Sequence, residues 1–156
     1  MGVESDEELL CIQIRGGADE TRINSALTAQ LPEGCELLSV NIARTESPFQ
    51  PRSATYVLPA RQEYLNEKLQ STTERLLASE NLYVRRRVDA KGSRVKNVDV
   101  RGFLKSIKLD RRGIIVECRI DPVGSIRIDE ILGLLELDES KLSGPIRRTS
   151  VQWRSQ

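Results

Sequence analysis

The sequence of 156 residues contains no histidine. Histidine is the side chain that most often acts as a general acid or base near neutral pH, and its absence excludes serine–histidine and cysteine–histidine nucleophile pairs. Carboxylates or lysines could still perform catalysis, but no pair of carboxylates has a spacing that indicates acid–base chemistry. We therefore expect a chain that is not an enzyme in its own right and has no catalytic residue.

Cysteine is scarce as well. The three residues, Cys11, Cys35 and Cys118, are far apart in the sequence, and each is flanked by apolar residues. An odd number of scattered cysteines favours neither a disulfide framework nor a zinc site. We expect these thiols to be small buried groups, and we expect the chain to hold no metal and no cofactor.

Long apolar runs are missing too. No segment approaches the roughly 20 apolar residues that a membrane-spanning helix requires. The chain opens on the acidic residues Glu4, Asp6, Glu7 and Glu8 instead of a basic and then apolar leader. These features predict a cytoplasmic protein without membrane contact, and we expect the acidic run to be solvated and frayed.

Aromatic residues make up only 4% of the chain, so the core must be aliphatic. Proteins that bind single-stranded nucleic acid typically stack bases on aromatic side chains. The sequence shows no such stacking surface, so any RNA contact is expected to involve the phosphate backbone. The single tryptophan, Trp153, is either a core anchor on the last strand or an exposed contact residue.

Charge is abundant, and it is distributed unevenly. Residues 1–80 contain 7 basic and 13 acidic residues, a net charge of −6, whereas residues 81–156 contain 17 basic and 10 acidic residues, a net charge of +7. An asymmetry of this kind indicates that the second half of the chain faces a polyanion.

Apolar periodicity and turn residues predict an α+β protein with a mainly antiparallel sheet, split ferredoxin-like β-α-β halves and an extended basic hairpin. The expected strands are residues 8–15, 35–43, 53–60, 83–88, 94–100, 104–109, 114–120 and 146–153, and the expected helices lie between residues 19 and 32, 62 and 80, and 128 and 137. Residues 1–52 are expected to form one β-α-β half, and residues 53–156 an α+β half.

The most basic element is the hairpin expected over residues 83–100. Successive side chains of a strand point to opposite faces, and neither face of this hairpin is uniformly apolar. Its charges could bind phosphates, could serve only to prevent edge-to-edge aggregation, or could contact an acidic protein. Arg101 could instead pair locally with Asp99. The candidate nucleic-acid-binding residues are Arg85, Arg86, Arg87, Lys91, Arg94, Lys96, Arg101, Arg147 and Arg148.

Several segments together resemble a known family. They are MGVES at the start, NSAL at residues 24–27, LPEG at 31–34, VDVR at 98–101, LKSI at 104–107 and RRTSV at 147–151. Through these segments the chain resembles the radical-SAM-linked protein family, a bacterial domain of unknown function. Its members occur beside, or fused behind, a radical SAM protein with a cobalamin-binding-type domain.

The resemblance implies an accessory or substrate-presenting domain whose partner is a radical SAM protein, encoded by an adjacent gene or fused in the same chain. The CxxxCxxC motif of that partner is absent here, so this chain is not expected to generate the radical. The resemblance also implies an RNA or ribosome setting, and a further segment upstream of GVES that residues 1–52 would complete. A module that docks the partner without binding nucleic acid is the alternative.

Overall fold

The computed structural model describes residues 2–14, 16–17, 19–42, 49–87 and 94–154. The chain divides into two compact units: Met1–Glu8 with Gln50–Arg154, and Leu9–Phe49 with Ser155–Gln156. The predicted division at residue 52 therefore needs a correction at the N-terminus. Residues 3–5 form strand β1, which pairs with residues 146–148 near the other end of the chain, so the first residues belong with the larger unit.

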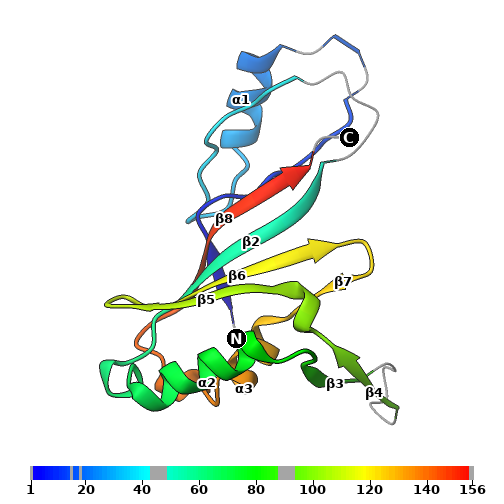
Figure 1. Ribbon diagram of the computed structural model, residues 1–156. Coiled ribbons are helices and arrows are strands. Elements are labelled where there is room, and N and C mark those ends of the chain that lie inside the picture. Colours follow the sequence, from blue (N-terminus) through cyan, green and yellow to red (C-terminus); the bar gives the residue numbers. More distant parts are fainter. Residues whose placement is uncertain (1, 15, 18, 43–48, 88–93, 155–156) are drawn as a thin grey trace. The chain divides into compact units, whose positions relative to one another are not determined.

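The larger unit is built on a six-stranded sheet (Figure 1). Its strands, in spatial order, are β1 (Val3–Ser5), β8 (Ile146–Arg154), β2 (Gln50–Leu58), β6 (Gly113–Asp121) and β5 (Leu104–Asp110), with β7 (Gly124–Ser125) paired to the end of β6. The β1–β8 pair is parallel, and all the remaining strand pairs of this sheet are antiparallel. The predicted α+β class and the mainly antiparallel sheet are confirmed.

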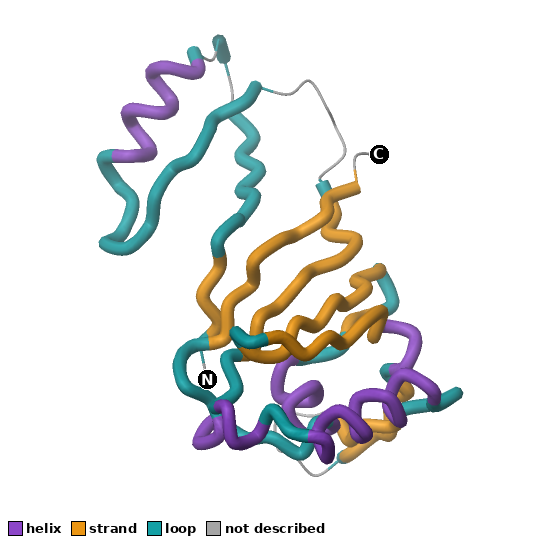
Figure 2. The backbone as a smooth tube through the Cα atoms, turned by 60° about the vertical axis from the view of Figure 1, so that its left-hand side comes forward, coloured by secondary structure: helices purple, strands orange, loops and turns teal. Residues whose placement is uncertain are grey.

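Two helices, α2 (Glu67–Ala78) and α3 (Ile128–Leu134), lie on one face of this sheet, as Figures 1 and 2 show. The helix predicted over residues 62–80 begins as a single 3₁₀ turn, Gln62–Tyr64, and the α-helix itself begins at Glu67, with Asn66 as its N-cap. The Asn66 side-chain oxygen accepts a hydrogen bond of 3.1 Å from the Leu69 backbone N–H, as expected of an asparagine N-cap.

The core between the helices and the sheet is aliphatic, as the low aromatic content predicts. Leu58, Ile114 and Val116 of the sheet and Ile131 of α3 are fully buried within it. The alternation of β6 supplies this layer, because every second side chain points toward the helices. Trp153 is half-buried on β8 opposite Pro51, outside the core cluster.

A separate two-stranded sheet follows α2. Strands β3 (Tyr83–Arg87) and β4 (Val95–Asp99) pair antiparallel, which confirms the predicted basic hairpin. Its expected turn at residues 90–93 lies outside the described residues.

The smaller unit contains helix α1 (Glu20–Thr28), which begins at the predicted N-cap Asp19. The strands predicted over 8–15 and 35–43 are wrong wherever the structure describes these residues, because 8–14 and 35–42 are in no strand. Alternating apolar residues specify a face for a strand, but a strand also needs a neighbour for its backbone hydrogen bonds. Among the described residues of this unit, the exposed large apolar side chains are Leu9, Leu10, Ile12, Ile14, Leu31, Leu38 and Ile42.

No helix among the described residues is both long and apolar enough to cross a membrane.

Candidate nucleic-acid interface

The β3–β4 hairpin has two unlike faces, which its register defines. Tyr83 pairs with Asp99, Arg85 with Asn97 and Arg87 with Val95, and the six residues of these pairs are all exposed. We call this set the outer face. The alternate residues, Val84, Arg86, Lys96 and Val98, form the inner face, of which only Lys96 is exposed. The prediction that neither face is uniformly apolar therefore holds, but the inner face is more buried than the outer one.

The inner face fastens the hairpin to the rest of the larger unit. Val84 and Val98 lie opposite each other and pack against the hydrophobic core. Arg86 lies two residues after Val84 on the same face. Its guanidinium group donates two hydrogen bonds to the carboxylate of Glu130 in α3, from Nε to Oε1 at 2.6 Å and from Nη2 to Oε2 at 2.8 Å. The Nη2 group also donates to the Ser125 carbonyl at 2.7 Å.

This ion pair shifts the protonation equilibrium of both partners. The hydrogen bond from Arg86 to Glu130 raises the pKa of the guanidinium above its usual value. Burial opposes ionisation of Glu130, but the Arg86 hydrogen bond and the Arg127 backbone N–H together hold the pKa of this carboxyl below its usual range. Both groups are therefore charged at neutral pH, and the paired fork geometry favours one orientation of β3.

The base of the hairpin is also fixed by hydrogen bonds. The Asp99 carboxylate accepts from the backbone N–H groups of Leu82 at 2.9 Å and Arg101 at 3.0 Å, and these bonds lower the pKa of Asp99. The predicted Asp99–Arg101 pair thus exists, but it uses the Arg101 backbone.

The Arg101 side chain binds backbone carbonyls near the C-terminal end of α2. Its guanidinium nitrogens donate to the backbone carbonyls of Leu77 at 2.6 Å, Ser79 at 2.9 Å and Leu104 at 2.9 Å. A helix leaves its last carbonyls without partners inside the helix, and a cation there also complements the helix dipole. Arg101 therefore joins α2, the hairpin and β5.

The predicted binding residues of the hairpin thus divide into two groups. Arg85 and Arg87 lie on the outer face, and Arg94 and Lys96 are also exposed. The predicted phosphate contacts at Arg86 and Arg101 are not supported, because both guanidinium groups are held by groups of this chain. Lys91 lies outside the described residues.

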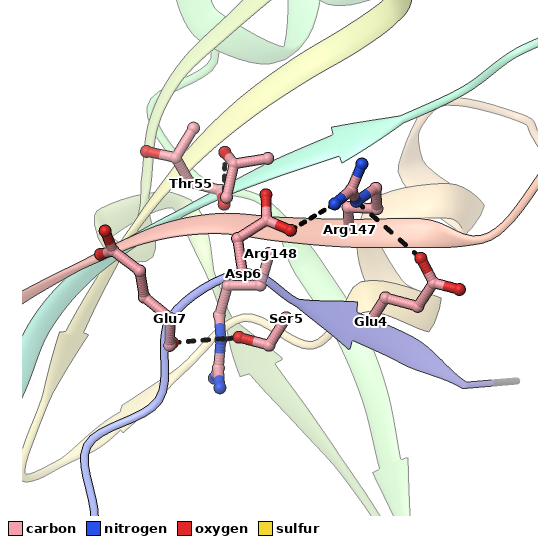
Figure 3. A network of polar contacts seen from close by, with 8 residues as sticks. Glu4, Ser5, Asp6, Glu7, Thr55, Arg147 and Arg148 are labelled. Atoms are coloured by element: carbon pink, nitrogen blue, oxygen red, sulfur yellow. Dashed lines mark hydrogen bonds and ion pairs between the residues drawn. The ribbon is translucent and has the colours of Figure 1, made fainter. Parts of the chain in front are cut away.

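The second predicted cluster, Arg147 and Arg148, lies on β8 beside β1. Figure 3 shows Arg147 between two acids: its Nη2 contacts the Asp6 carboxylate, and its Nε lies 3.8 Å from Glu4 Oε2. Arg148 Nη2 contacts the Glu8 carboxylate. These three acids are exposed, as expected of a solvated run, but the expectation of a frayed run is wrong for them, because the β1–β8 pairing brings them to the arginines. Acids of the same chain thus offset both positive charges.

Two residues of the interface were missed by reasoning from sequence. One is Glu130, because nothing in the local sequence indicates that its partner, Arg86, lies 44 positions away. Tyr83 stands on the outer face with 66% of its surface exposed. The spacing of Tyr83, Arg85 and Arg87 by two residues was the available signal, since such residues share a face of a strand.

The three cysteines differ in their surroundings. Burial and the neighbouring Glu117 carboxylate raise the pKa of the Cys118 thiol to about 12, so this thiol stays protonated at neutral pH. Cys11 and Cys35 are exposed, contrary to the expectation that all three thiols are buried. Within the described ranges, no three acidic or cysteine side chains lie close enough together to hold a metal ion.

Comparison with known proteins gives a match to one family model. No curated protein and no solved structure matches the chain. The family model matches residues 1–133, a range that includes the hairpin and α2, ends within α3 and leaves out β8. The family description names no ligand and no partner. Because the match covers most of the chain, the protein belongs to the family described as an uncharacterized protein conserved in bacteria, DUF2344.

Proposed function

We propose that this protein is a non-catalytic accessory domain of a radical SAM system and contacts RNA through the outer face of its β3–β4 hairpin. The radical SAM partner is inferred from the resemblance of the sequence segments. The RNA contact is inferred from the chemistry of the hairpin.

The observation behind the RNA contact is the placement of Arg85 and Arg87. Both are exposed on one face of one strand, about 7 Å apart along it. No ion pair to either side chain is found within the described part of the chain. A guanidinium group binds a phosphate through paired hydrogen bonds, and each neutralised phosphate releases counterions into solution. Two such groups in line suit a phosphate backbone that follows the strand.

The inner face supports this use of the outer face. Binding is weakened when side chains and backbone must be ordered at the moment of contact. Here Arg86, Val84 and Val98 already hold the hairpin against α3 and the core of the larger unit, and the Asp99 carboxylate fixes the base of the hairpin. The hairpin therefore presents Arg85 and Arg87 from a backbone that is ordered before binding.

Fluorescence anisotropy with a labelled RNA at low salt tests the contact. Wild-type protein is expected to bind, and the double variant Arg85→Ala/Arg87→Ala is expected to bind roughly tenfold more weakly or worse. A matched control is Arg111→Ala/Arg112→Ala, which removes the same charge from the turn between β5 and β6, where both residues are exposed. No binding by the wild type, or equal loss in both double variants, would overturn the proposal.

A second candidate function is docking of the radical SAM partner without nucleic acid. It is favoured by the apolar side chains that the smaller unit exposes, among them Leu10, at 76% exposure, and Leu38, at 69%. Exposed apolar clusters on a protein are typical of interaction surfaces. Co-purification of the two proteins that resists nuclease treatment, and that is lost in Leu10→Ser/Leu38→Ser, would support docking.

A further inference from the structure

We propose that the outer face of the hairpin binds unpaired RNA, with one base stacked on the ring of Tyr83. This inference rests on the proposed RNA contact and adds a substrate class to it: a single-stranded segment, as opposed to a duplex. Reasoning from composition alone predicted backbone contact without stacking, and the position of Tyr83 is the observation that changes this expectation.

Tyr83 is unlike the other tyrosines of the chain. Tyr56 and Tyr64 are partly buried and pack against the aliphatic core, whereas Tyr83 is 66% exposed and takes no part in that core. A tyrosine ring offers a large apolar surface, which is costly to leave in water and is available for stacking. Its place as the first residue of β3, directly after the anchored base of the hairpin, holds its backbone in position.

The ring lies in line with the two cations of the same face. Tyr83, Arg85 and Arg87 occupy alternate positions of β3, so the row extends over roughly 14 Å. Proteins that bind single strands combine aromatic rings for the bases with cations for the backbone, and stacking accepts any base because every base has a π face. The outer face contains one aromatic ring and two cations in a row, which is enough to contact a few nucleotides.

Asp99, the acidic residue of the outer face, makes the two ends of the Tyr83–Arg85–Arg87 row electrostatically different. Asp99 pairs with Tyr83 across the two strands, and the hydrogen bonds from the Arg101 and Leu82 amides lower its pKa, so it stays ionised. A carboxylate beside the ring repels phosphate. The phosphate backbone is therefore directed to the Arg85 and Arg87 end, and the uncharged base to the Tyr83 end. Asn97, opposite Arg85, adds an amide that can both donate and accept a hydrogen bond.

A duplex cannot use this surface in the same way. Its bases are already stacked on one another, and the deep, narrow major groove of A-form RNA keeps side chains from their edges. Only the two arginines would then contribute, through phosphates. Stacking on Tyr83 requires a base that is free of its neighbours, in a loop, a bulge or an end.

The test compares one RNA sequence in two states. A labelled 12-nucleotide RNA of mixed sequence, and the same strand annealed to its complement, are titrated with wild type, Tyr83→Leu and Tyr83→Phe at low salt. Tyr83→Leu is expected to weaken binding of the single strand by about 5- to 100-fold and to leave duplex binding within about twofold. Tyr83→Phe retains the ring and should bind like the wild type. Thermal unfolding of each variant verifies that it is folded.

The outcomes separate this inference from the function on which it rests. If wild type binds neither RNA, the RNA contact and the stacking proposal both fail. If Arg85→Ala/Arg87→Ala abolishes binding while Tyr83→Leu binds the single strand as wild type does, the RNA contact stands and the stacking proposal is overturned. Tighter binding of the duplex than of the single strand by wild type would overturn it as well.

Discussion

Arg85, Arg86 and Arg87 are neighbours in the sequence, but the alternation of β3 gives them different surroundings. Arg85 and Arg87 are exposed, whereas the Arg86 side chain is 17% exposed and faces a Glu130 side chain that is 8% exposed. A largely buried ion pair adds little net stability, but loss of one partner leaves the other charge buried without compensation. We therefore expect the middle arginine to matter for folding and its neighbours for binding.

Removal of the middle side chain tests this division. Arg86→Ala is expected to lower the free energy of unfolding by about 3 kcal/mol. Arg85→Ala removes an exposed side chain of the same type and is expected to change it by less than about 0.5 kcal/mol. Urea unfolding at pH 7, followed by the fluorescence of the single tryptophan, measures both values. Equal stability of the two variants would contradict the role of Arg86 as an anchor.

The same ion pair predicts a dependence on pH. With its pKa below the usual 4.5, Glu130 stabilises the fold above the pKa of the unfolded chain, and this contribution is lost as the pH falls through the folded-state pKa. In Arg86→Met, burial remains without the ion pair, so the Glu130 pKa is expected to rise above 4.5, and protonation then favours folding.

The destabilisation caused by Arg86→Met is therefore expected to be smaller at pH 4 than at pH 7. Urea unfolding of wild type and variant at both pH values gives the two differences in free energy. Since the other carboxyls are common to both proteins, they cancel in this comparison. A difference that does not depend on pH would show that the Glu130 carboxyl is not held by Arg86.

At the scale of elements, the turn between β5 and β6 depends on one glycine. Gly113 has a φ of +133°, and a Cβ atom built there would lie 2.2 Å from the Leu58 carbonyl oxygen in the neighbouring strand. Gly113→Ala would therefore combine an unfavourable backbone conformation with a clash against backbone. We expect it to lower the free energy of unfolding by about 3 kcal/mol or more.

Gly102→Ala provides the matched control for that substitution. Gly102 has no atom within 4 Å of a built Cβ and no positive φ, so the change is expected to stay within about 1 kcal/mol. Thermal or urea unfolding of both variants checks the prediction. Similar effects at the two sites would mean that the close approach of Gly113 to β2 is not present in solution.

The elements that could be predicted from sequence are those whose signals are local. The basic hairpin and the pair β5–β6 each combine alternating apolar residues with a turn, and both are confirmed. Strand β1 was missed, because the residues that pair with it, Ile146–Arg148 of β8, come from the other end of the chain. Segments 8–14 and 35–42 have the alternation of strands but gain no strand neighbour in the described residues, and alternation alone cannot reveal this.

The candidate interface was likewise predictable only in part. Its place on the hairpin follows from the density of arginine and lysine. Which arginines are exposed could not be read from the sequence, because the partner of Arg86 comes from α3 and the partners of Arg101 are backbone carbonyls of α2 and β5. Which arginines are exposed and which are held by other groups of the chain therefore depends on tertiary packing within the larger unit.

At the scale of the whole molecule, the charge asymmetry of the sequence is reduced by pairing within the chain. The second half has a net charge of +7, but Arg147 and Arg148 are offset by acids from the first eight residues. On the hairpin, Arg85 and Arg87 are exposed and have no ion pair within the described part of the chain, and Lys96 is exposed as well. RNA affinity should therefore depend on a few side chains instead of the total charge.

The salt dependence of RNA binding tests this claim most directly. For single strands, the slope of log affinity against log salt is about −0.7 for each phosphate neutralised. The slope for Arg85→Ala/Arg87→Ala is therefore expected to be about 1.4 shallower than that of the wild type, and the slope for Arg111→Ala/Arg112→Ala unchanged. Equal slopes for the wild type and the hairpin variant would contradict the claim that the outer face of the hairpin contacts the RNA backbone.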